Sequence, residues 1–317
     1  MEQTVIHIGY HKSASTFLQK IVFPQLPVNY VFFAGPERKF LNMVEGREDL
    51  DADAVHMWIN DELTRKYPND HQAVTVLSHE ELSGHPNGYR LVDSATIAEN
   101  LWRLFPQAKI LVIVRNQLDY LMSMYTYRVA IKGYETRSFT RYIQEEGEKG
   151  LLDHLEYHRL VERYQELFGA SQILVLPMEM LKKNPKELYD KLFTFLRVPH
   201  REIRQSEPMN VSTKSSLVIS IWRPINWMFS VLLRMMIFLA RKESEAYPFR
   251  KFRYSYYHLK RKATKMLNGL FRSSKSLDIR VIRGYPELLE RFENSNARLE
   301  KIANMDLVAL GYPVHKE

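Results

Sequence analysis

Short apolar runs rich in β-branched residues alternate with longer stretches of helical hydrophobic spacing along the first 200 residues. Runs that are apolar at nearly every position predict strands buried on both faces. Four such strands are predicted, at residues 4–8, 73–77, 109–114 and 172–176. Helices are predicted among them, at about 15–23, 94–105, 117–132, 151–168 and 185–196. This alternation predicts the α/β class, a three-layer αβα arrangement with a central parallel sheet.

The pattern loosens beyond residue 200. Residues 217–240 are strongly apolar, but four residues interrupt them: Arg223, Pro224, Asn226 and Arg234. The uninterrupted pieces are therefore shorter than the ~20 apolar residues of a membrane span. A last helix is predicted at about 285–303. We expect a single domain over 1–317, with a helical, basic and apolar insertion over 205–280 as a C-terminal extension.

Charge is distributed unevenly along the chain. The net charge is +8 at pH 7. Residues 241–275 contain 11 Lys or Arg and 2 Glu, a balance of +9, which leaves 34 basic and 35 acidic residues elsewhere, a balance of −1. The excess positive charge therefore belongs to one segment.

Composition and the N-terminus bear on the compartment. The chain has no cysteine, which excludes disulfides, thiolate metal sites and cysteine nucleophiles. The first residues, Met-Glu-Gln-Thr, lead into the first predicted strand without the basic and apolar regions of a signal peptide. We therefore expect a cytoplasmic protein, peripheral at the inner membrane face if the basic segment contacts lipid.

The loop after the first predicted strand has the composition of a phosphate-binding turn. Gly9 ends the strand, Lys12 follows three residues later, and small hydroxyl residues open the next helix: Ser13, Ser15 and Thr16. Free N–H groups and the positive dipole end of a helix attract anions, and the lysine and hydroxyls add charge and donors. The ligand expected here is a phosphorylated nucleotide or a similar donor.

This loop is not a Walker A loop. That motif requires a second glycine directly before its lysine, whereas His11 precedes Lys12. The third predicted strand also ends in Val114-Arg115, where a carboxylate would be needed to hold Mg²⁺. These departures disfavour a P-loop kinase acting on a small molecule, which stays open as an alternative.

A second anion site is predicted after the third strand. Arg115 stands at the strand end and Ser123 follows eight residues later, about two helical turns on. A guanidinium fork and a hydroxyl suit a second phosphate. Because ligands bind at the carboxyl ends of parallel strands, Lys12, Arg115 and residues 78–81 are expected at one edge of the sheet.

Together these two motifs resemble those of the PAPS-dependent sulfotransferases. Gly9–Leu18 matches the family's 5′-phosphosulfate loop, with Ala14 at a position that is often glycine. Arg115–Tyr125 keeps the arginine, serine and tyrosine of the 3′-phosphate motif, with Gln117 where proline is usual and Tyr120 where arginine is frequent. Further similarity covers Leu77–Ser83, Leu176–Leu181, Phe193–Val198 and Asn296–Pro313.

The resemblance implies a P-loop-like nucleotide site and in-line transfer of a sulfuryl group from PAPS, leaving PAP, without a metal. Lys12 would stabilise the leaving phosphate oxygen. Arg115 and Ser123 would bind the 3′-phosphate. The 5′-phosphosulfate end would be bound by the loop residues His11, Lys12, Ser13, Ala14, Ser15, Thr16 and Phe17.

A general base must accept the proton of the acceptor, and the second predicted strand ends in Ser78-His79-Glu80-Glu81. Glu80 is preferred, because Ser-x-Glu-x-Leu resembles the carbohydrate-type and bacterial members of the family. His79 is the alternative base, and Glu81 is interpreted as a surface carboxylate. His7, which alternates with apolar strand residues, is interpreted as structural.

Residues 217–265 leave three interpretations open. They can form a helical subdomain with a solvated basic face, an element that contacts an anionic membrane surface, or a groove for an anionic glycan or, less favoured, a nucleic acid. The acceptor is expected to be a glycan, a glycolipid or another hydroxyl compound. A non-enzymatic protein that binds membranes or nucleic acid is a further alternative, although it would leave Lys12 and Arg115 unexplained.

Overall fold

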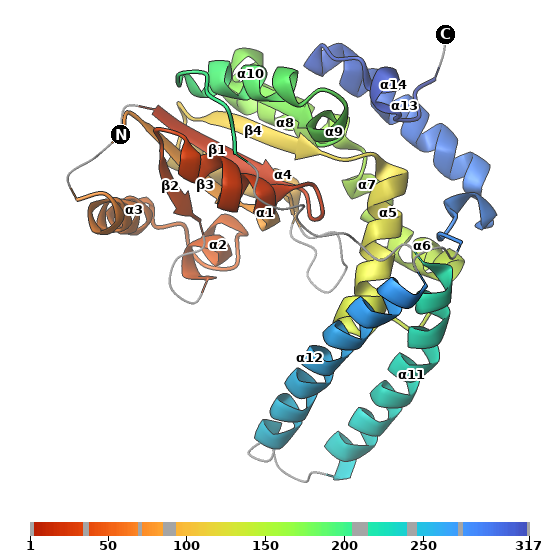
Figure 1. The fold of residues 1–317 in the computed structure, drawn as a ribbon. Coiled ribbons are helices and arrows are strands. Elements are labelled where there is room, and N and C mark those ends of the chain that lie inside the picture. Colours follow the sequence, from red (N-terminus) through yellow and green to blue (C-terminus); the bar gives the residue numbers. More distant parts are fainter. Residues whose placement is uncertain are drawn as a thin grey trace. The chain divides into compact units, whose positions relative to one another are not determined.

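The computed structural model describes residues 3–33, 38–68, 72–84, 93–204, 215–239, 246–271 and 275–315. The chain divides into two compact units (Figure 1). The first comprises Met1–Gln117, Glu146–Met209 and Pro286–Glu317. The second comprises Leu118–Glu145 and Asn210–Tyr285. The expectation of a single domain with an insertion over 205–280 stays a prediction.

The first unit is built on a five-stranded parallel sheet in the order β2-β3-β1-β4-β5. Its strands are β1 (Gln3–Gly9), β2 (Asn29–Phe32), β3 (Val74–His79), β4 (Lys109–Val114) and β5 (Ile173–Pro177). The four predicted strands are confirmed, and the short edge strand β2 was not predicted. Ile8 pairs with His79 and Gly9 pairs with Ile113. The loops that follow β1, β3 and β4 therefore emerge at one edge of the sheet.

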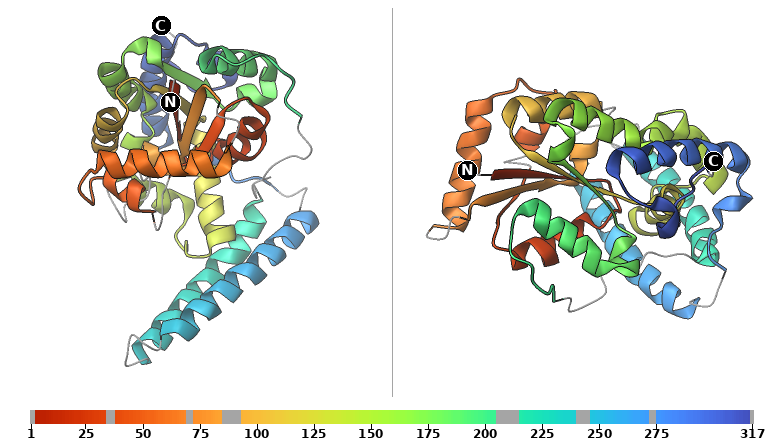
Figure 2. Two further views of the ribbon diagram at one scale, coloured as in Figure 1. Left: turned by 90° about the vertical axis from the view of Figure 1, so that its left-hand side faces the viewer. Right: turned by 90° about the horizontal axis from the view of Figure 1, so that it is seen from above.

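Helices cover both faces of this sheet (Figures 1 and 2). The helices of this unit are α1 (Ser15–Phe17), α2 (Lys39–Val44), α3 (Ala52–Lys66), α4 (Ser94–Leu104), α7 (Leu151–His154), α8 (Tyr157–Phe168), α9 (Met180–Lys183), α10 (Pro185–Leu196), α13 (Tyr285–Ala303) and α14 (Leu307–Leu310). Phe17 and Val22 pack with Leu192 of α10 into the core on one face, and α4 packs with α8 on the other. The predicted αβα class, with a helical C-terminal region, is confirmed.

Three predicted helices differ in detail. The helix at 15–23 is a short α-helix followed by a π-helical segment, Leu18–Val22, and a 3₁₀ turn, Phe23–Gln25. Pro24 lacks an N–H and ends regular helix there. The helix at 117–132 is α5 (Gln117–Thr126) followed by a π-helical segment, Tyr127–Lys132. The helix at 151–168 is divided into α7 and α8.

The second unit is helical. It contains most of α5, its π-helical extension, α6 (Phe139–Gly147), α11 (Ser216–Leu239) and α12 (Ala246–Leu270). In Figure 1 and in the left view of Figure 2, α11 and α12 lie side by side as a hairpin. Asn226 of α11 donates its amide to the carbonyls of Val129 and Glu135. Lys260 of α12 donates to the same Val129 carbonyl, at 2.6 Å. These buried polar contacts fix the hairpin to the π-helical segment.

Candidate active site

The loop between β1 and α1 holds two non-glycine residues in the left-handed region of backbone conformation. Lys12 has φ 63° and Ala14 has φ 62°. The N–H of Ser13 donates to the Tyr10 carbonyl at 3.1 Å, and the N–H of Phe17 donates to the Ala14 carbonyl at 2.9 Å. Such conformations cost about 1–3 kcal/mol each and persist where the surroundings enforce them, often at functional sites. The loop is therefore a strained turn at the carboxyl end of β1, and backbone hydrogen bonds keep it in this conformation.

Two serines in this loop have hydrogen-bonding capacity that the described part of the chain does not use. The Oγ atoms of Ser13 and Ser15 are both buried and have no partner among the described residues. The position of Ser15 requires glycine at residue 9, because a Cβ at Gly9 would lie 2.0 Å from Ser15 Oγ. Unpaired buried hydroxyls cost about 1–3 kcal/mol each. Donors of this kind fit the oxygens of a phosphate or sulfate group.

The remaining predicted residues of the loop differ in their surroundings. His11, Lys12 and Thr16 are partly exposed. The side chain of Phe17 packs into the hydrophobic core, so Phe17 can offer a ligand its backbone at most, and its N–H already donates to Ala14.

Arg115, at the end of β4, contacts the loop directly. Its Nη1 donates to the Lys12 carbonyl at 2.9 Å, although 103 residues separate the two in the chain. The carbonyl of Arg115 accepts from the hydroxyl of Tyr157 at 2.8 Å. The structure thus brings together Lys12 and Arg115, as the position of both at strand ends predicts.

Ser123 is buried on α5. It belongs to the second unit, whereas Arg115 belongs to the first. The pairing of Ser123 with Arg115 therefore stays a prediction.

Residues far along the chain hold the turn after β4, and sequence reasoning did not assign them this role. Glu179 accepts from the Asn116 N–H at 2.9 Å and from the hydroxyl of Tyr312 at 2.7 Å. Burial, reinforced by the negative charge of Glu179, raises the pKa of Tyr312, so Tyr312 stays a neutral donor. Similarity over Leu176–Leu181 and Asn296–Pro313 was the one signal in the sequence that pointed to these segments.

Gln117 stands where the resembling motif usually has proline, and its side chain has a structural partner. The amides of Gln117 and Asn296 exchange hydrogen bonds of 2.6 and 3.2 Å. Asn296 also donates to the Pro313 carbonyl at 2.7 Å. This buried pair anchors the start of α5 to the C-terminal segment.

His79, Glu80 and Glu81, at the end of β3 and directly after it, have different surroundings. Burial raises the pKa of Glu80, the charge of Glu81 raises it further, and the charge of Lys12 partly opposes both. Nδ1 of His11 lies 3.8 Å from Oε1 of Glu80. His79, by contrast, is buried, and its Nδ1 accepts from the Glu81 N–H at 3.1 Å. The Glu81 carboxylate forms an ion pair with Arg38. Glu80 therefore interacts with the loop after β1, through the charge of Lys12 and through its proximity to His11.

His7 has the surroundings of a structural residue. It is fully buried, and its Nδ1 lies 2.7 Å from the Ser78 hydroxyl. Burial lowers the pKa of His7 to about 3, so the ring is neutral. Within the described ranges, no group of three or more His, Asp or Glu side chains is placed to hold a metal ion.

Comparisons with known proteins identify the family. The model of the sulfotransferase domain matches residues 2–217, which is more than half of the chain. The chain therefore belongs to the sulfotransferase family and is a transferase. A search of curated proteins gave no match.

Solved structures with similarity to this chain include two sulfotransferases. The sulfotransferase from Alicyclobacillus acidocaldarius is 16% identical, with 71% of this chain and 92% of that chain covered and a TM-score of 0.46. Mouse sulfotransferase SULT7A1, in complex with PAP, is 17% identical, with 64% of this chain and 61% of that chain covered and a TM-score of 0.39.

Proposed function

We propose that the chain transfers a sulfuryl group from PAPS to a hydroxyl group of a glycan or a lipid-linked saccharide. The observation that carries the proposal is the hydrogen bond from Arg115 to the Lys12 carbonyl, which joins two predicted anion sites. PAPS has two separate phosphate-bearing ends, at the 5′ and 3′ positions of its ribose. A donor with a single phosphate-bearing end would leave one of the two sites without a ligand.

The residues present suit this donor. The orphaned hydroxyls of Ser13 and Ser15 and the turn around Lys12 would hold the 5′-phosphosulfate end. Arg115 would hold the 3′-phosphate, with Ser123 as its predicted partner. PAPS supplies the sulfuryl group and a phosphate leaving group. Lys12 would stabilise the negative charge that develops on the phosphate oxygen, an effect that counts most in a preorganised site.

Glu80 is proposed as the general base. The reaction forms a bond between the acceptor oxygen and sulfur, breaks the bond between sulfur and the 5′-phosphate oxygen, and moves the acceptor proton to the Glu80 carboxylate. A raised pKa makes a carboxylate a stronger base near neutral pH. His79 is the less favoured base because its Nδ1 already accepts the Glu81 N–H.

The acceptor class rests on the similarity of Ser78–Leu82 to carbohydrate-type members. Transfer of label from radiolabelled PAPS would be screened over glycans, glycolipids and phenols. We expect label in a glycan or glycolipid, and transfer to phenols alone would contradict the acceptor class.

The same screen, run on two variants, tests the role of the loop. Lys12→Met should lower turnover by about 10²–10³-fold, the loss typical for one preorganised charge stabiliser. Lys20→Met, which removes an exposed lysine from the adjoining segment, is the matched control and should keep full turnover. Equal turnover in the two variants would remove Lys12 from the mechanism.

A further inference from the structure

Helix α11 is apolar on two faces. One face is buried, through the apolar Val218, Ile219 and Trp222 and the hydrogen-bonded Asn226. The other face is exposed, with apolar residues at alternating spacings of four and three: Leu217, Ile221, Pro224, Met228, Val231 and Met235. We call these six residues, together with Trp227, the exposed face of α11. Contiguous exposed apolar side chains on one helix face are typical of surfaces that bind a partner or a lipid phase.

The large side chains in the C-terminal half of this face are well exposed. The exposed fractions of Trp227, Met228 and Met235 are 60%, 66% and 57%. Over Ser216–Met235 the helix is long and apolar enough to cross a membrane by length and composition alone, and 22% of that stretch is buried. Length and composition do not decide whether such a helix spans a bilayer or lies on it.

The composition of the neighbouring helix, α12, argues against a hairpin that spans the bilayer. α12 lies beside α11, and its sequence contains seven Lys or Arg residues: Arg250, Lys251, Arg253, Lys260, Arg261, Lys262 and Lys265. Arg261, Lys262 and Lys265 are exposed. Each charged side chain at the bilayer centre costs at least ~2.5–3.5 kcal/mol. A hairpin of this composition can therefore place one apolar face on a bilayer but cannot cross it.

Arginines gather beside the exposed face. A cleft of about 770 Å³ in the second unit is lined by Thr136, Arg137, Ser138, Arg141, Ser220, Arg223, Pro224 and Trp227. Pro224 and Trp227 belong both to this cleft and to the exposed face of α11. Apolar side chains and guanidinium groups therefore share one surface of the same unit.

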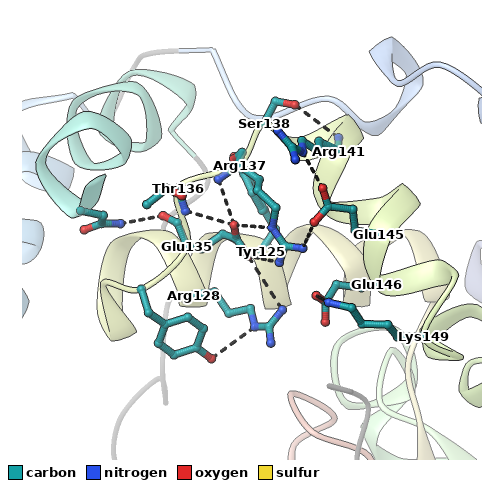
Figure 3. Close-up of polar contacts among 12 residues, drawn as sticks. Tyr125, Arg128, Glu135, Thr136, Arg137, Ser138, Arg141, Glu145, Glu146 and Lys149 are labelled. Atoms are coloured by element: carbon teal, nitrogen blue, oxygen red, sulfur yellow. Dashed lines mark hydrogen bonds and ion pairs between the residues drawn. The ribbon is translucent and has the colours of Figure 1, made fainter. Parts of the chain in front are cut away.

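The arginines of the cleft are only partly neutralised. Figure 3 shows Arg137 bonded to Glu135 and Glu145, and Arg141 bonded to Glu145. Arg223 donates to the Thr136 carbonyl at 3.3 Å, and among the described residues it has no carboxylate partner. The three arginines that line the cleft face two glutamates, Glu135 and Glu145, which leaves a balance of +1 among these five side chains.

We propose that this surface of the second unit binds an anionic phospholipid bilayer. The apolar side chains of the exposed face enter the acyl region, Trp227 lies at headgroup depth, and the arginine cleft receives headgroup phosphates. A second copy of the chain is a poorer occupant, because each copy brings the segment 241–275 with its balance of +9. The inference is independent of the reaction, since lipid binding requires neither PAPS nor an acceptor.

Vesicle flotation without PAPS tests the proposal. Vesicles of phosphatidylcholine alone would be compared with vesicles containing about one quarter phosphatidylglycerol, at low and high salt. We expect at least tenfold tighter binding to the anionic vesicles and a loss of that difference at high salt. The fluorescence of Trp227 should shift to shorter wavelength with anionic vesicles, and Trp227→Phe should abolish the shift. Equal binding to both vesicles, or none at low salt, would overturn the proposal.

Matched variants locate the surface. The triple variant Met228→Ser, Val231→Ser and Met235→Ser should bind anionic vesicles at least tenfold more weakly, and Arg223→Gln about fivefold. Val281→Ser, an equally exposed apolar change in the same unit outside the face, should bind like the wild type. Circular dichroism would establish that each variant is folded. If the triple variant instead converts a dimer to a monomer and still binds vesicles normally, a second copy occupies the face and the proposal fails.

Discussion

Glu80 and Glu81 are neighbours in the sequence, yet their carboxylates experience opposite surroundings. Burial and the nearby negative charge raise the pKa of Glu80, whereas Glu81 is held by Arg38. A carboxylate that is poorly solvated is the stronger base, and one that is ion-paired is the weaker. The two residues therefore make a matched pair for testing which carboxylate accepts the acceptor proton.

Glu80→Gln should lower kcat by about 10²–10⁴-fold, because the variant lacks the general base that takes the proton of the acceptor hydroxyl. Glu81→Gln should change kcat less than about threefold, and neither variant should change the affinity for PAP. The wild-type kcat/KM should also fall as the pH decreases through the raised pKa of Glu80, since only the ionised carboxylate is a base. Full turnover of Glu80→Gln would assign the base elsewhere, with His79→Ala as the next variant.

Removing the unpaired hydroxyls of Ser13 and Ser15 should affect stability and PAP affinity differently. Ser13→Ala and Ser15→Ala remove buried hydroxyls that have no partner among the described residues, so the free energy of unfolding should stay equal or rise by about 1 kcal/mol. PAP affinity should fall about tenfold or more, because a charged ligand loses a donor. Denaturant unfolding and calorimetry measure the two quantities.

Ser295→Ala is the contrasting variant for this prediction. The hydroxyl of Ser295 lies 2.9 Å from Nδ1 of His158, in a buried contact. Its loss should cost about 1 kcal/mol of stability and leave PAP affinity unchanged. If Ser13→Ala behaves like Ser295→Ala, the loop serines are structural.

At the scale of residues, the sequence predicted the chemistry of the strand ends but not their supports. The anion-binding roles of Lys12 and Arg115 were predicted because each residue follows an apolar run that is predicted to be a strand of the parallel sheet. Glu179 and Asn296 could not be assigned, because their hydrogen bonds cross 63 and 179 residues and leave no periodic trace. Long-range polar pairs are decided by packing, which single-sequence patterns do not encode.

At the scale of elements, β1 and the loop after it depend on one glycine. Gly9→Ala would place a Cβ 2.0 Å from Ser15 Oγ and 3.1 Å from Ser15 Cβ. The serine would have to turn away, so PAP affinity should fall at least tenfold, with a loss of about 1–3 kcal/mol in stability. Titration calorimetry and urea unfolding would measure both effects.

Gly269→Ala is the matched control, because a Cβ there meets nothing within 4 Å on helix α12. Alanine is the better helix former, so this variant should gain up to about 1 kcal/mol of stability and bind PAP normally. If Gly9→Ala also binds PAP normally, the loop does not hold the 5′-phosphosulfate end.

The elements differ in how well the sequence predicted them. α10 begins with Asn184, which caps the helix by accepting from the Glu187 N–H, and with Pro185 at its first position, so its bounds matched the prediction. α3 was not predicted, because only Val55, Ile59 and Leu63 are buried on a largely polar helix. The helix after the loop was predicted as regular, whereas Ala14 in the left-handed region and Pro24 leave it short.

At the scale of the whole molecule, the second unit carries a pH-dependent contact. Burial lowers the pKa of Lys260 to about 7, although its two carbonyl-type acceptors and the ring of Trp222 favour its charged form. Between pH 7 and the ordinary pKa of 10.5, the unfolded chain holds a proton that the folded chain has released. Stability should therefore rise with pH over this window, by about 1–3 kcal/mol.

Urea unfolding at pH 7 and pH 9.5 would measure this rise. Lys260→Met removes the titrating group and should remove the rise, so the difference between wild type and variant isolates its effect from other titrations. If the stabilities of wild type and variant change equally between pH 7 and pH 9.5, Lys260 stays charged in the folded chain.

The parallel sheet, its layers and the family were predictable for the whole molecule, because they follow from the periodicity and from two local motifs. The exposed face of α11 was not. The sequence left residues 217–265 as a solvated subdomain, a membrane element or an anion-binding groove. The structure adds which face of the helix is packed and which is exposed, and composition alone does not carry that information.

Calorimetric titration of the wild-type chain with PAP and with AMP tests the central claim, a grip on two phosphates, most directly. PAP should bind at least tenfold more tightly than AMP, because only PAP has the 3′-phosphate that Arg115 would hold. Arg115→Ala should reduce the affinity for PAP to that for AMP. Equal affinity of the wild type for PAP and AMP would contradict the account.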